Sequence, residues 1–256
     1  MKKFFKAISE KLRILKNKKL GSLNYVLIIL GVLLIFMISL MFGYGLSTKS
    51  LIVASSKQLN ESYYLLEAGK FDEYNEAQET ACKIQTQGGA GYIFYDAGFR
   101  VFWAGYVNKL DAERVRDNNS SLNLSIYELT IKNIDFTSDF SQNINQMFKS
   151  NLICFKSCIG ALDNLVVKYE KGEETISYVK NNCLILTEEA EQQYEKLNDN
   201  FYQDATMYKL RSYYKEFVTN IKEITNINLE GVDFSKTLRF KEISCMFCLK
   251  KIADTI

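Results

Sequence analysis

The sequence predicts an α+β protein with an N-terminal transmembrane helix, a small βαββαβ antiparallel-sheet domain and a C-terminal α-helical bundle or hairpin. Three observations lead to this prediction: an uncharged apolar run, a repeated strand-and-helix pattern after it, and long apolar stripes at helical spacing. We divide the chain into a basic tail (1–22), a membrane span (23–47), a connector (48–60), a sheet domain (61–133) and a helical domain (136–256).

The apolar run covers residues 25–44, and no charged residue falls between Leu20 and Thr48. Crossing the hydrocarbon core of a bilayer takes about 20 mostly apolar residues. Inside lipid, such a run satisfies its own backbone hydrogen bonds only as a helix. The other interpretation is a buried helix of a soluble protein, and we favour the membrane span because of its length and lack of charge.

The residues that flank the span predict its orientation. Eight basic residues and one acidic residue, Glu10, precede it, which by the positive-inside rule keeps the N-terminus in the cytoplasm. The run is longer than the apolar core of a cleaved signal peptide and ends without a small-residue cleavage pattern. We therefore predict an uncleaved signal anchor in a single-pass protein of the cell membrane, with the C-terminal part extracytoplasmic.

Composition limits the function of the extracytoplasmic part. After the tail is set aside, 24 of the 32 basic and 29 of the 30 acidic residues remain, so this part is mildly acidic and a poor match for nucleic acid. The chain has no histidine, which removes the commonest general base and metal ligand. We expect no enzymatic activity, no catalytic residues, no cofactor and no metal.

Six cysteines follow the membrane span: Cys82, Cys154, Cys158, Cys183, Cys245 and Cys248. An even number in an exported domain is compatible with disulfides, and the C-x-x-x-C and C-x-x-C spacings with a four-cysteine zinc site. Both spaced pairs lie among apolar residues at helical spacing, where cysteine behaves as a small buried hydrophobe. We favour core packing, for Cys183 in particular, and leave the other two interpretations open.

Residues 63–131 repeat one pattern. Two aromatic-rich strands, at 63–71 and 99–107, each run through Ala-Gly into a polar turn and a helix. A glycine-rich link at 88–98 contains a short strand, and residues 122–131 make a last one. Two such halves build a four-stranded antiparallel sheet with both helices on one face. We expect residues 59–133 to fold alone.

The motifs Leu66-Glu67-Ala68-Gly69-Lys70-Phe71 and Arg100-Val101-Phe102-Trp103-Ala104-Gly105-Tyr106 stand on either side of this link, and Asp111-Ala112-Glu113 follows. With these motifs the region resembles the SPOR domain, the peptidoglycan-binding module of bacterial cell division and sporulation proteins. The resemblance implies that glycan strands stripped of their stem peptides bind across the open face of the sheet.

Alternation along the strands predicts which residues line that face. Side chains two apart in a strand share a face, and the set that contains Ala68 and Ala104 suits close packing under helices. The opposite set is the predicted glycan-binding face: Tyr63, Leu65, Glu67, Val101 and Trp103. Trp103 could stack on a sugar ring and Glu67 could accept hydrogen bonds from hydroxyls. The alternative for Trp103 is burial, for example under the C-terminal helices.

Apolar stripes at helical spacing dominate the second half. One runs through residues 144–169 and stops at Lys171-Gly172, and a second runs through 176–224 with a break expected near Asn198. A last helix is predicted at 236–253. Such stripes favour an antiparallel bundle or hairpin over a coiled coil with a partner.

Two functions follow from these expectations. The first is a membrane-anchored, extracytoplasmic peptidoglycan-binding protein of cell division or sporulation, whose partners are glycan strands and the lipid bilayer. The alternative is an envelope scaffold or signalling protein whose helical domain binds another protein while the sheet only packs. RNA-binding RRM domains share the strand order, but no aromatic RNA-binding motif is legible, and we predict no nucleic-acid partner.

Overall fold

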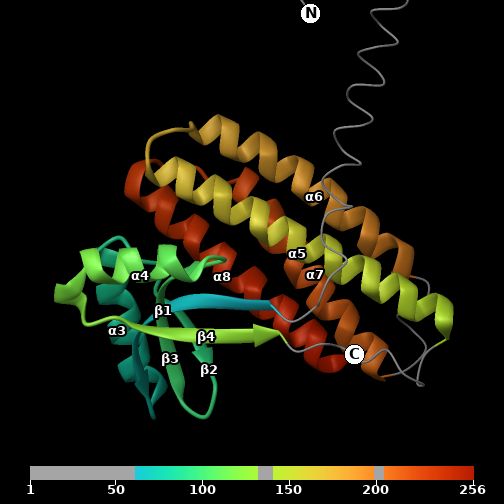
Figure 1. Cartoon of the computed structure of the whole chain (residues 1–256), viewed down its shortest axis with the longest axis horizontal. Coiled ribbons are helices and arrows are strands. Elements are labelled where there is room, and N and C mark those ends of the chain that lie inside the picture. The colour runs from blue at the N-terminus through green and yellow to red at the C-terminus, as the bar shows by residue number, and fades with distance from the viewer. Residues whose placement is uncertain (1–60, 132–140, 199–204) are drawn as a thin grey trace, which may run out of the picture. The chain divides into compact units, whose positions relative to one another are not determined.

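The computed structural model describes residues 61–131, 141–198 and 205–256 (Figure 1). The predicted tail, membrane span and connector lie outside these residues. The described elements are, in chain order, β1 (Glu61–Phe71), α3 (Tyr74–Thr86), β2 (Tyr92–Tyr95), β3 (Phe99–Tyr106), α4 (Lys109–Asn118), the short 3₁₀ helix η1 (Ser120–Leu122), β4 (Ser125–Ile131), α5 (Gln142–Glu170), α6 (Ile176–Asn198), α7 (Ala205–Thr225) and α8 (Gly231–Thr255). The fold is α+β, an antiparallel sheet followed by helices, as predicted.

The sheet has four strands in the order β2-β3-β1-β4, and every neighbouring pair is antiparallel. The central pair carries two irregularities. Between the pairs Leu66–Ala104 and Glu67–Phe102, β3 has one extra residue, Trp103. One pair further on, β1 has an extra residue of its own. An extra residue of this kind is a β-bulge, and it changes which face the following side chains point to.

Helices α3 and α4 cover one face of the sheet. Small residues on these helices, Ala77 and Ala81 of α3 and Ala112 of α4, are buried there. Against them pack Val101 of β3 and Leu66 of β1, both fully buried. Alanine lets the helix backbone approach the strands closely. The strand alanines Ala68 and Ala104 lie in the same clusters, so they are under the helices as predicted.

The opposite face of the sheet packs against α8. Aromatic side chains of the sheet surround Phe247 of α8, whose ring centroid lies 3.9 Å from that of Phe94 and 5.6 Å from those of Tyr92 and Phe102. Tyr63 is fully buried in the same cluster. The cluster continues without interruption into α5, α6 and α7, so the sheet and the helices share one core (Figure 1).

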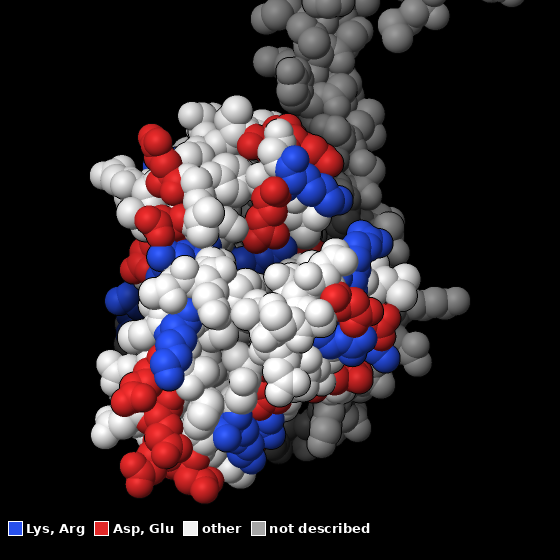
Figure 2. Space-filling model, turned by 90° about the vertical axis from the view of Figure 1, so that its left-hand side faces the viewer, with Lys and Arg blue, Asp and Glu red and all other residues white. Residues whose placement is uncertain are grey.

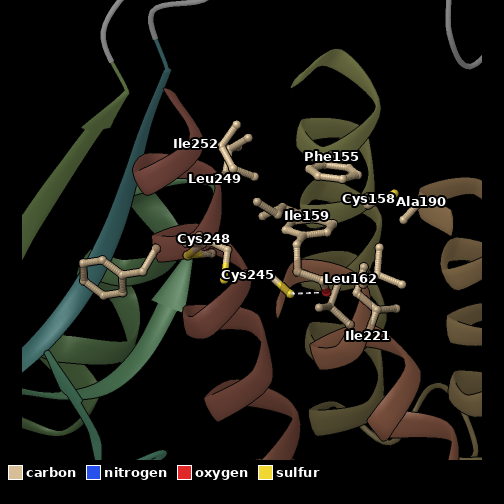
Figure 3. Close-up of a cluster of buried hydrophobic side chains, with 14 of the residues drawn as sticks. Phe155, Cys158, Ile159, Leu162, Ala190, Ile221, Cys245, Cys248, Leu249 and Ile252 are labelled. Atoms are coloured by element: carbon tan, nitrogen blue, oxygen red, sulfur yellow. Dashed lines mark hydrogen bonds between the residues drawn. The ribbon is translucent and has the colours of Figure 1, made fainter. Parts of the chain in front are cut away.

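Helix α8 lies at the centre of that core. All eight residues of the stretch 242–249 are buried, although a surface helix would expose one side. The sheet contacts one side of α8, and α5 and α7 contact the other. Figure 3 shows the second interface, where Phe155 and Ile159 of α5 lie near Ile221 of α7 and Cys245 of α8. All described elements accordingly belong to one compact unit, Lys57–Ile256.

Helix boundaries in the second half follow the sequence signals, except that α8 begins at Gly231 and so includes part of the link expected before residue 236. Helix α5 begins after Ser141, whose side chain accepts a hydrogen bond from the amide of Ile144, and ends at Lys171 before Gly172, which has a φ of 71°. The second stripe forms two helices: α6 ends at Asn198, and α7 begins at Ala205.

Helix α5 is the one described helix long and apolar enough to cross a membrane. Core helices of soluble proteins also meet that criterion, and α5 packs into the shared core through fully buried residues such as Phe148, Phe155 and Leu162. This weak signal does not bear on the span predicted at 23–47, which lies outside the described residues.

Candidate functional site

The five residues of the predicted glycan-binding face do not share an open surface. Tyr63 and Leu65 point to the side away from α3 and α4, as alternation predicts, but both are fully buried in the core cluster that contains α8. The expectation that this part of the sheet is open is wrong. Its apolar side chains hold the C-terminal helices, a long-range packing that local patterns do not reveal.

Val101 and Trp103 lie on the other face of the sheet. Val101 is fully buried with Ala77, Ala81 and Ile84 of α3. Trp103 is half-buried between the α3 and α4 clusters, and a Cβ added at Gly89 would come within 2.6 Å of its ring. The alternative that Trp103 is buried therefore fits the structure better than an open face. The ring is covered by α3 and α4, however, and not by the C-terminal helices.

Glu67 is the one charged residue of the predicted set, and it forms an ion pair within the sheet. Its carboxylate accepts a hydrogen bond from Arg100, with 2.7 Å between Oε1 and Nη1. Arg100 also donates from Nε to Asp96 Oδ2 at 3.2 Å, and its guanidinium lies 4.8 Å from the ring centroid of Tyr127. The Tyr127 hydroxyl donates to the same Asp96 oxygen. We call Glu67, Asp96, Arg100 and Tyr127 the Arg100 cluster.

The strands bring the Arg100 cluster together from four places in the chain. Arg100 and Tyr127 belong to β3 and β4, Glu67 to β1, and Asp96 to the turn between β2 and β3. In the sheet register Arg100 pairs with Phe94, and the ring of Phe94 stacks on Phe247 of α8. The Glu67 and Arg100 side chains are mostly buried, with 12% and 18% of their surface exposed, whereas Asp96 is 45% exposed. The cluster therefore lies at the margin of the α8 interface.

The charges of the Arg100 cluster stabilise one another. Burial opposes the charge on Arg100, but the hydrogen bond and charge of Glu67, followed by those of Asp96, outweigh it and raise the pKa of Arg100. Burial and the charge of Asp96 raise the pKa of Tyr127. One cation and two carboxylates leave a net charge of minus one. The cluster can accept hydrogen bonds and offers an aromatic surface, but it holds no activated nucleophile.

A second polar group, the Arg239 cluster, lies inside the protein between α8, α5 and β3. Arg239 donates from Nη1 to Glu242 Oε2 at 2.9 Å and from Nη2 to Glu170 Oε2 at 2.6 Å. Asp163 lies 3.5 Å from Nη1, and the guanidinium stacks over the Tyr106 ring at 4.4 Å. We define the cluster as Asp163, Glu170, Arg239 and Glu242. A buried charge requires such partners.

Sequence reasoning missed the Arg239 cluster. The available signal was a pair of opposite charges three residues apart, Arg239 and Glu242, directly before the mostly apolar stretch 243–249 of the last helix. Both side chains are buried in the structure, and Arg239 is 2% exposed. Burial raises the pKa of the Glu242 carboxyl well above its usual range, with Arg239 opposing and Asp163 reinforcing the shift.

The cysteines mostly pack in the core. Cys158, Cys183, Cys245 and Cys248 are buried and free, which confirms the core interpretation for these four. Cys82 is exposed on α3, beside an open hollow of about 580 Å³ lined by polar side chains. Among residues 61–131, 141–198 and 205–256, no three cysteines or acidic residues lie close enough to hold a metal ion.

The outer surface carries both signs of charge. Figure 2 shows acidic and basic side chains on one face separated by wide uncharged areas, with acidic groups gathered at its lower left. The exposed large apolar side chains are scattered over β2, α3, α4, α6, α7, α8 and the loop before α8, for example Tyr95, Ile185 and Tyr208. A comparison of the chain with protein families, curated proteins and solved structures finds no match.

Proposed function

We propose that this chain is a membrane-anchored, extracytoplasmic scaffold or signalling protein whose folded unit binds another envelope protein. The observation that carries the proposal is the burial of Tyr63, Leu65 and Phe102 in the core that the sheet shares with the C-terminal helices, where Phe102 packs on Phe247 of α8. A sheet face that holds the helices cannot also serve as a platform for a polymer. The sheet then has the packing role that the alternative function assigns to it.

The membrane anchor in this proposal is the uncharged segment 23–47, with the basic tail 1–22 in the cytoplasm. Reporter fusions test it directly. A reporter that is active only in the cytoplasm should work when fused at Met1 and fail when fused at Ile256. The opposite pattern would overturn the topology and with it the extracytoplasmic function.

Cross-linking in living cells tests the scaffold. The full chain is compared with a chain ending at residue 60, which keeps the anchor but lacks every described element. A membrane-impermeant amine-reactive cross-linker should give a discrete adduct with one other protein for the full chain alone. An adduct with both chains would assign the contact to the anchor, and no adduct would contradict the scaffold.

A second candidate is the binding of denuded glycan strands, as the resemblance to the SPOR domain and its βαββαβ order implies. The observation that favours it is the position of Glu67 at the margin of the α8 interface, next to Arg100 and Tyr127. A carboxylate, a guanidinium and an aromatic ring are groups that can bind sugar hydroxyls and pack on sugar rings. The site would be the Arg100 cluster and not the buried apolar residues.

Sedimentation with purified denuded sacculi distinguishes the two functions. Glycan binding predicts that the full chain in detergent sediments with sacculi and that Glu67→Gln weakens this about tenfold, because a hydrogen bond to a charged group contributes about 1.5–3 kcal/mol. Arg114→Gln on α4, 64% exposed, is the control and should bind like the parent. A parent that stays in the supernatant contradicts glycan binding and leaves the scaffold.

A further inference from the structure

Two exposed aromatic side chains, Tyr74 and Tyr95, meet at a third ring, that of Phe99. The ring centroids of Tyr74 and Phe99 lie 5.5 Å apart and those of Tyr95 and Phe99 lie 5.0 Å apart, both in edge-to-face geometry. Tyr74 is the first residue of α3, whereas Tyr95 and Phe99 pair with each other across the hairpin of β2 and β3. We call these three residues the aromatic patch.

The aromatic patch is exposed at its two outer rings and anchored at the inner one. Tyr95 is 65% exposed and Tyr74 is 51% exposed, whereas Phe99 is partly buried against the apolar cluster between α3 and β3. Single exposed apolar residues are common on protein surfaces, but adjoining ones mark interaction sites. Tyrosine is also enriched among the residues that contribute most to protein–protein binding. The patch therefore has the composition of a protein-binding surface on a firm base.

The Arg100 cluster holds the turn that follows Tyr95. Asp96, the next residue, accepts hydrogen bonds from Arg100 Nε at 3.2 Å and from the Tyr127 hydroxyl at 3.3 Å. Ala97, in the same turn, has a φ of 46°, a left-handed conformation that a residue other than glycine adopts only at a cost. A turn fixed in this way positions Tyr95 before any partner arrives, and pre-organisation reduces the entropy that binding must overcome.

Acidic residues border the aromatic patch. Asp72 and Glu73 directly precede Tyr74, and Glu76 lies in the first turn of α3. All three acids are exposed, and none of them forms an ion pair with another residue that the structure describes. The basic residue closest to them in sequence is Lys70, so acids outnumber bases around the patch. Both the negative faces of aromatic rings and unpaired carboxylates favour a cation as their partner.

We propose that the aromatic patch is the surface by which the folded unit binds another envelope protein, and that this partner presents a basic segment. Lysine or arginine side chains of the segment lie over the rings of Tyr74 and Tyr95, and their charges pair with the acids before α3. The inference rests on the scaffold function proposed above and adds the site and the chemistry of the partner. A glycan strand fits the patch less well, because sugar hydroxyls bring no cation.

Photo-cross-linking in living cells tests the site. In the full chain, p-benzoylphenylalanine, which keeps an aromatic ring, replaces Tyr74, Tyr95 or, as the matched control, Tyr208 of α7, which is 64% exposed. Irradiation should give an adduct with one other protein from positions 74 and 95 and none from position 208. Mass spectrometry should place the cross-link in a partner segment rich in lysine and arginine.

A second comparison tests the ring and the charges separately. With the photoreactive residue kept at position 74, Tyr95→Ser should lower the yield of the adduct about fivefold, because it removes one of the two rings that face the cation. Asp72→Asn combined with Glu73→Gln should also lower it. Glu73 makes no side-chain capping bond at the start of α3, so this change leaves the helix in place. Tyr178→Ser, on α6, is the control and should leave the yield unchanged.

The contrary outcomes separate the patch from the scaffold function. An adduct from position 208 alone, or a cross-linked segment without basic residues, would overturn the patch and leave the scaffold. An adduct with glycan or with a second copy of the chain would overturn the proposed partner. If the amine-reactive cross-linker gives its adduct but positions 74 and 95 give none, the patch is again overturned. If neither method gives an adduct, the scaffold function falls as well.

Discussion

The guanidinium of Arg239 in α8 donates a hydrogen bond from Nη1 to the backbone carbonyl oxygen of Gly105 in β3, across 2.8 Å. The same side chain binds Glu242 within its own helix and Glu170 at the end of α5. One buried cation thus connects the sheet, the central helix and the bundle. Its removal should affect all three, because each of them contributes a polar group that would lose its partner.

Arg239→Met should lower the free energy of unfolding by about 3–5 kcal/mol, because Glu170, Asp163 and the buried carbonyl of Gly105 would all lose their partner. The double variant Arg239→Met with Glu242→Leu should lose less than the single one, since it also removes the fully buried acid. Urea unfolding followed by circular dichroism measures both. Arg114→Met, on the exposed side of α4, is the control, and an equal effect of the two single changes would refute the role of Arg239.

The buried acid of the Arg239 cluster should make stability depend on pH. Burial raises the pKa of Glu242 above its ordinary value of 4.5, with Arg239 opposing and Asp163 adding to the shift. The folded protein thus keeps this proton to a higher pH than the unfolded chain. Its stabilising contribution is complete below pH 4.5 and is lost as the pH rises through the folded pKa.

Glu242→Gln is the matched variant, because an amide keeps the shape of the acid but cannot lose a proton. Relative to this variant, the parent should lose up to about 1.4 kcal/mol of unfolding free energy for each pH unit above the ordinary carboxyl range. Denaturant unfolding between about pH 5 and pH 8 measures the difference. Parallel curves for the two proteins would mean that Glu242 is ionised in the folded state.

Two glycines should respond to the same substitution with opposite signs. A Cβ at Gly105 would lie 2.9 Å from the sulfur of Met246 and 3.1 Å from Ile243, both in α8. Gly105→Ala should therefore cost about 1–3 kcal/mol by overpacking. Gly160 lies within α5 with nothing within 4 Å of its added Cβ, so Gly160→Ala should stabilise by about 0.5–1 kcal/mol. Thermal unfolding compares them, and a neutral Gly105→Ala would mean that α8 does not press on β3.

The sheet should not fold without the helices, contrary to what its repeated pattern suggests. A fragment of residues 59–133 would expose Tyr63, Leu65, Phe102, Leu129 and Ile131, which are all buried in the shared core. Large exposed apolar patches promote aggregation. Size-exclusion chromatography and circular dichroism should find this fragment aggregated or unfolded, and residues 57–256 folded and monomeric or in a defined oligomer. A monomeric, folded short fragment would separate the two parts into true domains.

The sequence allowed the α+β class, the antiparallel sheet and most helix boundaries to be predicted, because each rests on local periodicity, caps and turns. Lys171-Gly172 ends α5 where expected, and the apolar neighbours of Cys183 correctly placed it in the core. These signals involve residues close in sequence. They need no knowledge of what packs against the element.

The candidate site was predicted less well for two physical reasons. The first reason is that alternation fails at a bulge. Simple alternation puts Phe102 and Ala104 on one face, but the extra residue in β3 puts Trp103 and Ala104 on the same face and Phe102 on the opposite one. The second reason is long-range: nothing local to β1 reveals that Tyr63 is buried in a core shared with the C-terminal helices. The clue lay in α8 itself, because residues 243–249 are apolar on every side except for Ser244 and therefore need neighbours all round.

The central position of α8 has a consequence for the order of events during synthesis. The sheet is synthesised first, yet the helix that closes its apolar face is the last element described, about 100 residues later. Until residue 255 has emerged from the ribosome, the apolar face of the sheet and the side of the bundle that packs on α8 both remain uncovered. The shared core is therefore completed only when α8 has been made. A chain that ends before α8, through a ribosomal stall or cleavage, would expose this apolar surface to quality-control proteases.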